Sequence, residues 1–397
     1  MASKVPHYPP PRSDNTTPGF SNSLPSRPIL VDQSVAVQLH RLYRAELSDS
    51  EEIWRDRYLF FLQHGLELRF RYKPGWTASW LGTNLDPACC DDSIEQILPM
   101  VLDAKRKKDN AIVCIKLIKQ KSEEVNIGLY LSTEKMLHDP QNHCIPIWDH
   151  FCDPILPEVQ YIVMPVLRPF NNPEFYAVGE VVDFATQLLE GMAFMHSQLI
   201  AHGDLTTQNI MMDARPILPQ GWHFVVDNFA PNGVDLISPL SRIDHPVRYF
   251  IIDYDCAIRL QPGASHLIKG YGGRDGDVPE LATRQPFDIF KMDVFTLGNV
   301  FYKDFYQKYH GLDFLRGLID SMMTRDFNQR PTALAALQNW YKIRSQLDIT
   351  SARWRLRKQN ETVGERVVLD TVAAARNGIH SVKRLFNGKE RRPWKNT

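Results

Sequence analysis

The stretch that most constrains this chain spans residues 200–213 and reads IAHGDLTTQNIMMD. It places three polar residues, His202, Asp204 and Asn209, in one short loop. The apolar residues before the loop recur at helical spacing, which predicts one buried helix face. They are Val181, Ala185, Leu188, Met192 and Met195. The apolar run 210–212 after the loop predicts a strand. We therefore expect a buried helix, a polar loop and a strand in succession.

Four further segments follow this loop in a fixed order. An apolar run ends in Asp253, and the sequences VPE, DVFTLG and NQRPT stand at 278–280, 293–298 and 328–332. This order resembles the protein kinases, whose catalytic loop reads H-R-D-L-x-x-x-N and is followed by D-F-G and A-P-E. The resemblance covers residues 50–345. It implies that Glu280 and Arg330 form a buried ion pair.

The resemblance also implies a fold class and a chemistry. The fold would be α+β with two lobes, a small N-lobe built on an antiparallel sheet and a mostly helical C-lobe. The cofactors would be ATP and Mg²⁺, with Asp204 orienting and deprotonating the substrate hydroxyl. Asn209 and Asp253 would hold the magnesium ion. Structural bracing of the loop is the expected role of His202.

The N-terminal half carries the expected nucleotide-binding residues. Lys116 ends the apolar run Val-Cys-Ile-Lys, which matches the V-A-I-K that grips nucleotide phosphates in the family. A lysine whose stem lies along apolar surface would give the same pattern. Glu124 and Glu134 are alternative helix partners for Lys116, and we select Glu124. Met164 and Val166 lie at the expected junction of the lobes, where the resemblance puts the adenine.

Periodicity and turn residues predict the remaining elements. Ser48 and Glu51 offer a capping box for a lead-in helix that ends at residue 64. We expect strands at 66–72, 101–104, 111–118, 145–150 and 160–164, and later helices at 287–305 and 312–323.

The chain departs from the family at four places. Gly203 replaces an arginine that reads phosphorylated activation loops, and Thr206 stands where many members have a lysine. Asp255 replaces the glycine of D-F-G. The glycine-rich phosphate lid is missing, and Pro74, Gly75 and Trp76 stand in its place. These changes lower the expected catalytic rate more than nucleotide binding.

Composition predicts a disordered N-terminal arm and a basic C-terminal tail on either side of the two lobes. Residues 1–47 are rich in Pro, Ser, Asn and Thr, which predicts a mostly disordered arm. We expect the N-lobe at 48–164, the C-lobe at 165–345 with a proline-bearing insertion at 213–248, and a basic tail at 346–397. From residue 341 onward, 14 Lys and Arg stand against 5 Asp and Glu, an excess of 14 − 5 = 9. This excess suggests an acidic partner or docking onto the chain's own body, rather than nucleic acid.

Several protein classes are disfavoured. The start MASKVPHYPPPRS lacks the apolar core of a signal peptide, and Ala2 stands where myristoylation needs glycine. No apolar run reaches the ~18 residues that a membrane span requires. The six cysteines form no CxxC pair, and we assign the His143, Cys144, His150 and Cys152 group to a strand and its approach rather than to zinc. We expect an intracellular protein, cytoplasmic or nuclear.

We expect an ATP-dependent protein kinase that phosphorylates a protein hydroxyl, serine or threonine rather than tyrosine. A pseudokinase scaffold is the main alternative, favoured by the missing lid and Thr206. A phosphotransferase of the aminoglycoside or choline kinase type shares the HGD loop and the I-D-x-D segment, but lacks the VPE, DVFTLG and late arginine signals. The stretches 71–76, 142–146, 209–213 and 253–255 also resemble kinase-like proteins expanded in mushroom-forming fungi.

Overall fold

The computed structural model describes residues 44–119, 123–269, 273–283, 285–348 and 352–374. Most of the expected N-terminal arm, and the tail from residue 375, lie outside these ranges. The chain divides into two compact units. Unit 1 comprises Met1–Leu117, Phe151–Val166 and Gly221–Ile237, and unit 2 comprises Ile118–His150, Leu167–Gln220 and Ser238–Thr397.

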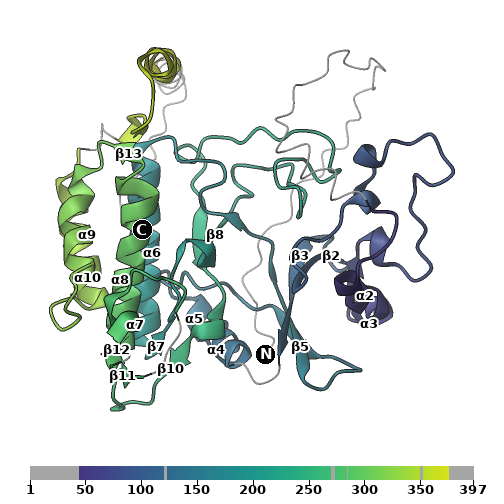
Figure 1. The fold of residues 1–397 in the computed structure, drawn as a ribbon, viewed down its shortest axis with the longest axis horizontal. Coiled ribbons are helices and arrows are strands. Elements are labelled where there is room, and N and C mark those ends of the chain that lie inside the picture. Colours follow the sequence, from purple (N-terminus) through teal and green to yellow (C-terminus); the bar gives the residue numbers. More distant parts are fainter. Residues whose placement is uncertain (1–43, 120–122, 270–272, 284, 349–351, 375–397) are drawn as a thin grey trace. The chain divides into compact units, whose positions relative to one another are not determined.

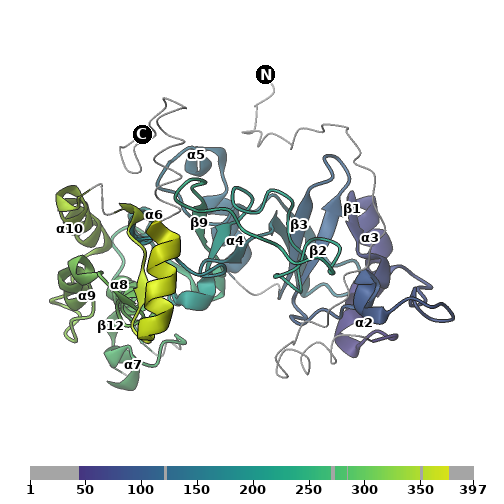
Figure 2. The ribbon, with the colours of Figure 1, turned by 90° about the horizontal axis from the view of Figure 1, so that it is seen from above.

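Unit 1 is built around a five-stranded sheet with the order β1-β2-β3-β5-β4. Its strands are β1 (Leu66–Leu68), β2 (Val101–Arg106), β3 (Ile112–Lys119), β4 (Asp149–Cys152) and β5 (Val159–Pro165). The first three strands pair antiparallel, with Leu66 opposite Arg106 and Val101 opposite Lys116. Two short helices, α2 (Asp49–Asp56) and α3 (Tyr58–Gln63), precede the sheet (Figure 2).

The expected lead-in helix begins as predicted but is broken once. Ser48 and Glu51 form the capping box, since the Ser48 N–H donates to Glu51 over 3.0 Å. The helix breaks at Arg57, whose guanidinium is buried and bonded to Asp153 over 2.8 Å. The expected strand at 66–72 is wrong in its second half, because residues 70–72 form a 3₁₀ turn that directs Arg71 inward. The strand predicted at 145–150 is also misplaced, because β4 begins at Asp149.

Unit 2 is mostly helical (Figure 1). Its helices are α4 (Glu124–Leu131), α5 (Glu134–Leu137), α6 (Val178–Ser197), α7 (Pro279–Thr283), α8 (Ile289–Phe301), α9 (Arg316–Met322) and α10 (Ala333–Gln346). Its strands are β6 (Arg168–Pro169), β7 (Ile200–Ala201), β8 (Ile210–Asp213), β9 (Arg248–Ile251), β10 (Ile258–Arg259), β11 (Leu267–Ile268), β12 (Phe287–Asp288), β13 (Tyr309–His310) and β14 (Arg357–Lys358). The strands pair in the orders β6-β8-β9, β10-β7, β11-β12 and β13-β14. Together with the sheet of unit 1, these elements confirm the expected α+β class.

The long helix α6 forms the centre of unit 2. Its five predicted core residues are all buried, at 1% exposure or less. Helix α10 packs against α6, and the buried Trp340 of α10 donates its Nε1–H to Thr186 of α6 over 2.9 Å. This packing holds α6, the helix that leads into the polar loop, against α10.

The segment 213–248 contributes to both units. Residues 221–237 belong to unit 1, where buried His223 lies 2.9 Å from Asp91 and Phe229 forms a bridge with Leu236. The chain on either side, including β8 and β9, belongs to unit 2.

The first part of the basic tail packs within unit 2. The Leu356 N–H donates to the Tyr176 carbonyl over 2.8 Å, and Arg353 pairs with Asp244 over 2.6 Å. Residues 363–374 are helical.

Candidate active site

The polar loop is anchored by one buried carboxylate. Asp293 of α8 is completely buried and accepts the backbone N–H groups of His202 and Gly203 over 2.7 and 2.8 Å. Its Oδ2 also lies 2.9 Å from His196 Nε2 on α6. Because these contacts tie α6, α8 and the loop together, Asp293 fixes the loop's path. The sequence singled out Asp293 as part of a motif without indicating this role.

Asp204 and Asn209 are brought into direct contact. The Nδ2 atom of Asn209 donates to the Asp204 carbonyl over 2.7 Å and to its carboxylate over 2.9 Å. Both residues are buried, at 2% and 3% exposure. The turn between them closes when the Asn209 N–H donates to the Thr206 carbonyl over 3.0 Å. Sequence spacing therefore identified a pair that the fold assembles.

His202 connects the loop to the next strand. Its Nδ1 accepts the Asp204 N–H over 3.2 Å, so its Nε2 is the protonated nitrogen and donates to the Ile252 carbonyl over 2.9 Å. The imidazole thus holds the loop against the residue that precedes Asp253. These contacts are those of a structural brace.

Asp253 lies beside Asn209 through strand pairing. Ile210 of β8 is opposite Ile251 of β9, and the Ile252 N–H donates to the Asn209 carbonyl over 3.0 Å. Asp253 itself has φ +67°, a left-handed conformation that is strained for a residue with a Cβ. Such strain is concentrated at functional sites, where the surrounding structure enforces it. Here the pairing of β8 with β9 supplies that constraint.

Backbone conformation explains why a glycine stands at position 203, besides the loss of the arginine charge there. Its φ is +78°, a region that glycine occupies without strain. A Cβ on Gly273 would lie 3.1 Å from the Gly203 carbonyl oxygen, so the two backbones approach closely. This close approach positions the residue after Gly273.

Arg274 is the site residue that the sequence did not indicate. Its backbone N–H donates to Asp204 Oδ1 over 3.1 Å, and its Nε lies 3.3 Å from Asp204 Oδ2. Its Nη2 lies 3.8 Å from Asp253 Oδ2. One arginine thus bridges the two carboxylates proposed for catalysis and metal binding. The only local signal was a glycine-rich, charged segment, which is common in surface loops.

Helix α4 packs against the residue after Asp253. The Tyr254 ring is buried, and a Cβ on Gly128 would lie 3.5 Å from that ring and 2.3 Å from Ile147 Cδ1. Gly128 therefore allows α4 to lie close to Tyr254. Glu124, in the first turn of α4, is 3% exposed, whereas Glu134 in α5 is exposed. Burial favours Glu124 of the two candidates.

The other three predicted residues belong to unit 1. Lys116 is half-buried on β3, opposite Val101. Met164 is buried on β5, and Val166 follows that strand. The expected grouping of Lys116 with Glu124 and Asp253 stays a prediction.

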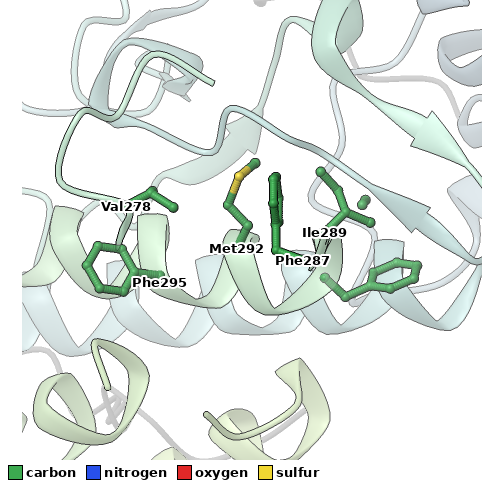
Figure 3. Close-up of a cluster of buried hydrophobic side chains, with 7 residues drawn as sticks. Val278, Phe287, Ile289, Met292 and Phe295 are labelled. Atoms are coloured by element: carbon green, nitrogen blue, oxygen red, sulfur yellow. The ribbon is translucent and has the colours of Figure 1, made fainter. Parts of the chain in front are cut away.

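The predicted ion pair between Glu280 and Arg330 is confirmed. Both side chains are buried and in contact. Burial lowers the pKa of the Arg330 guanidinium from its usual value, and the Glu280 charge opposes that effect. Beside this pair lies an apolar cluster that joins β7, the residue before α7, β12 and α8 (Figure 3). Its buried residues are Ala201, Val278, Phe287, Ile289, Phe290, Met292 and Phe295.

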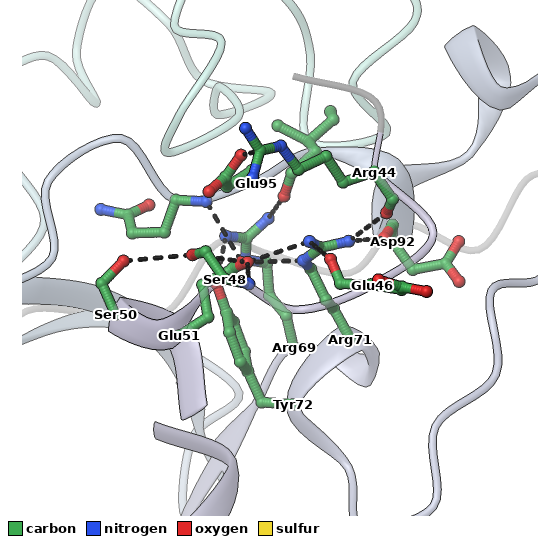
Figure 4. A network of polar contacts seen from close by, with 12 residues as sticks. Arg44, Glu46, Ser48, Ser50, Glu51, Arg69, Arg71, Tyr72, Asp92 and Glu95 are labelled. Carbon is green, nitrogen blue, oxygen red and sulfur yellow. Dashed lines mark hydrogen bonds and ion pairs between the residues drawn. The ribbon is translucent and has the colours of Figure 1, made fainter. Parts of the chain in front are cut away.

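A polar network occupies the place of the phosphate lid. Residues 69–100, a total of 100 − 69 + 1 = 32, separate β1 from β2. Buried Arg71 bonds to Glu51 over 2.7 Å and to the Asp92 carbonyl over 3.0 Å (Figure 4). The Asp92 carboxylate in turn accepts the Trp76 Nε1–H over 2.9 Å. Burial alone would raise the pKa of Glu51, but the hydrogen bonds from Arg71 and the Ser48 N–H outweigh it and lower that pKa.

The loop residues fit a magnesium ion that is bound together with phosphate. The Asn209 nitrogen is bonded to Asp204, so its Oδ1 is the atom that could face a cation. The Asp253 carboxylate is 22% exposed. Oxygen ligands suit Mg²⁺, which commonly takes one or two protein ligands and completes its shell with phosphates and water.

In the described ranges, no group of three or more His, Cys, Asp or Glu side chains could hold a metal ion. Burial raises the pKa of the Cys144 thiol to about 12.

Among the helices that the structure describes, none is both long and apolar enough to cross a bilayer.

A sequence comparison defines the family. The family described as the protein kinase domain matches residues 99–309, which are 309 − 99 + 1 = 211 of the 397 residues. The chain therefore belongs to the protein kinase domain family. Members of this family are typically phosphotransferases that bind ATP. The match begins two residues before β2, so it leaves out α2, α3, β1 and residues 69–98 of the segment that stands in place of the lid.

Proposed function

We propose that this protein is a kinase that uses ATP and Mg²⁺ to phosphorylate a protein hydroxyl, serine or threonine in preference to tyrosine. The observation that carries the proposal is the contact between Asp204 and Asn209, in a loop that the buried Asp293 carboxylate fixes. Phosphoryl transfer depends mainly on positioning and electrostatics, so a rigid acidic loop is the required element.

Each residue has a defined role in this proposal. Asp204 orients the substrate hydroxyl and accepts its proton as the oxygen–phosphorus bond forms. The bond to the departing diphosphate oxygen breaks, and ADP leaves. Asn209 and Asp253 hold Mg²⁺, which neutralises phosphate charge. Lys116, supported by Glu124, grips the phosphates, and Met164 and Val166 contact the adenine.

A pseudokinase scaffold is the second candidate. The observation that favours it is the bonded network at 69–100, because a segment held by buried Arg71 and Asp92 differs from a flexible glycine lid. A small-molecule phosphotransferase is disfavoured by the Glu280–Arg330 pair.

The chain shares motifs with the fungal kinase-like proteins, and we propose that it belongs to that subgroup. We further propose an intracellular setting, and docking of the basic tail on unit 2 or on an acidic partner.

Thermal unfolding with and without Mg²⁺ and ATP provides the first test. A ligand at about 100 times its dissociation constant stabilises the fold by about 2.7 kcal/mol. We expect a clear rise in melting temperature that Asp253→Asn and Lys116→Met each abolish. The absence of any rise in the parent protein would refute both phosphotransferase assignments. Transfer of labelled phosphate to mixed peptides, with Asp204→Asn as the inactive control, then separates a kinase from a scaffold.

A further inference from the structure

We propose that Arg274 is the cation that contacts the transferred phosphoryl group, in place of the lysine that Thr206 replaces. The inference rests on the proposed function. Its structural basis is the bridge from Arg274 to Asp204 at 3.3 Å and to Asp253 at 3.8 Å. A cation between the base and the metal ligand lies where the phosphate charge must be neutralised.

The charges around the loop call for such a cation. Asp204 and Asp253 are both acidic, and ATP adds further negative charge. Thr206 contributes none. Arginine is suited to this place because its planar guanidinium can bond two phosphate oxygens at once.

The position of Arg274 is set by its backbone rather than by its guanidinium. Its N–H is bonded to Asp204, and the next residue, Asp275, accepts the Nδ2 of buried Asn299 over 2.8 Å. Lys303, two residues after the end of α8, lies 2.5 Å from Asp277. These anchors hold the residue while its side chain exchanges partners.

The Arg274 guanidinium is better placed to exchange its carboxylate partners for a phosphate group than to block the site. The Arg274 side chain is 59% exposed, and its 3.8 Å contact with Asp253 is loose. A magnesium ion held by Asp253 would take up this carboxylate, and Arg274 Nη2 would then be available to a phosphate oxygen.

The test compares nucleotides that differ by one phosphate. Calorimetric titration with Mg²⁺ and either ADP or a non-hydrolysable ATP analogue gives the affinity ratio for the terminal phosphate. We expect Arg274→Met to lower the preference for the analogue at least tenfold, whereas Arg274→Lys retains part of it. The control Arg316→Met removes an arginine of similar exposure on α9 and should leave the ratio unchanged. Turnover by Arg274→Met should fall at least tenfold, with the KM for the protein substrate unchanged.

The outcomes separate the inference from the proposed function. Equal or tighter analogue binding by Arg274→Met, or faster turnover, overturns the role of Arg274 alone. If the parent protein binds neither nucleotide, the kinase assignment fails and this inference fails with it. If Arg274→Met does not fold, Arg274→Lys is the deciding variant. Full retention of the affinity ratio and of the turnover rate by Arg274→Lys would show that bonding of two phosphate oxygens by the planar guanidinium has no role.

Discussion

The buried pair of Glu280 and Arg330 provides the sharpest test of how the site is supported. Arg330 donates to three backbone carbonyls, those of Thr324, Lys291 and Arg325, over 2.6, 3.1 and 3.1 Å. Its guanidinium also lies 4.8 Å from the centre of the Phe295 ring. Arg330→Met therefore leaves a buried carboxylate and three carbonyls without their donor.

Replacing Arg330 and replacing Glu280 should lower the free energy of unfolding by different amounts. Breaking a buried ion pair by removing one partner costs about 3–5 kcal/mol. We expect Arg330→Met to lie in this range, because Glu280 is 6% exposed and gains little solvent. Glu280→Gln leaves the three carbonyls bonded to the guanidinium and should cost about 1–3 kcal/mol. The double variant Glu280→Met with Arg330→Met should recover part of the loss, because no buried charge remains.

Thermal unfolding measures this difference. At about 2–4 °C per kcal/mol for a domain of this size, Arg330→Met should lower the melting temperature by about 10 °C. The matched control is Arg316→Met, which breaks the exposed pair with Asp320 and should barely move it. The reasoning is refuted if Arg330→Met has the same melting temperature as the control, or if Glu280→Gln lowers the melting temperature more than Arg330→Met does.

Three further perturbations test other parts of unit 2. Gly128→Val should cost about 1–3 kcal/mol and weaken nucleotide binding, because its side chain would push α4 away from Tyr254; Gly317→Ala, with open space around it, is the matched control, and equal melting temperatures would contradict the packing argument. Asp293→Asn should cost about 2–4 kcal/mol and reduce phosphate transfer, since the amide keeps one acceptor oxygen where the two N–H bonds use two; full activity in a peptide assay would contradict the anchoring role. Burial raises the pKa of Asp183 to about 6, so its folded form favours the proton and its contribution to stability is lost as pH rises from about 4 through 6. Asp183→Asn should therefore stabilise the fold by at most about 3 kcal/mol at pH 7.5 and by less than about 1 kcal/mol at pH 4.5, and a gain in urea unfolding that is independent of pH would show that desolvation is not the cause.

Local patterns predicted much of the framework. The helical repeat of α6, the capping box at Ser48 and the apolar run before Asp253 depend on neighbours a few residues apart, so the sequence displays them directly. The spacing from Asp204 to Asn209 identified a contact because both belong to one tight turn. The pairing of Glu280 with Arg330 followed from the family resemblance, which encodes distant contacts that periodicity does not.

The sequence by itself determined helix α6, the polar loop that follows it and the strand that ends just before Asp253, because these features arise from short-range spacing and burial. Only the tertiary structure decided that Arg274 reaches Asp204, that Asp293 fixes the loop, and that Arg71 turns inward to Glu51 where a strand was expected. These contacts join residues from separate elements. A buried charge selects its partner by proximity and desolvation in the folded chain, and no repeat in the sequence records that choice.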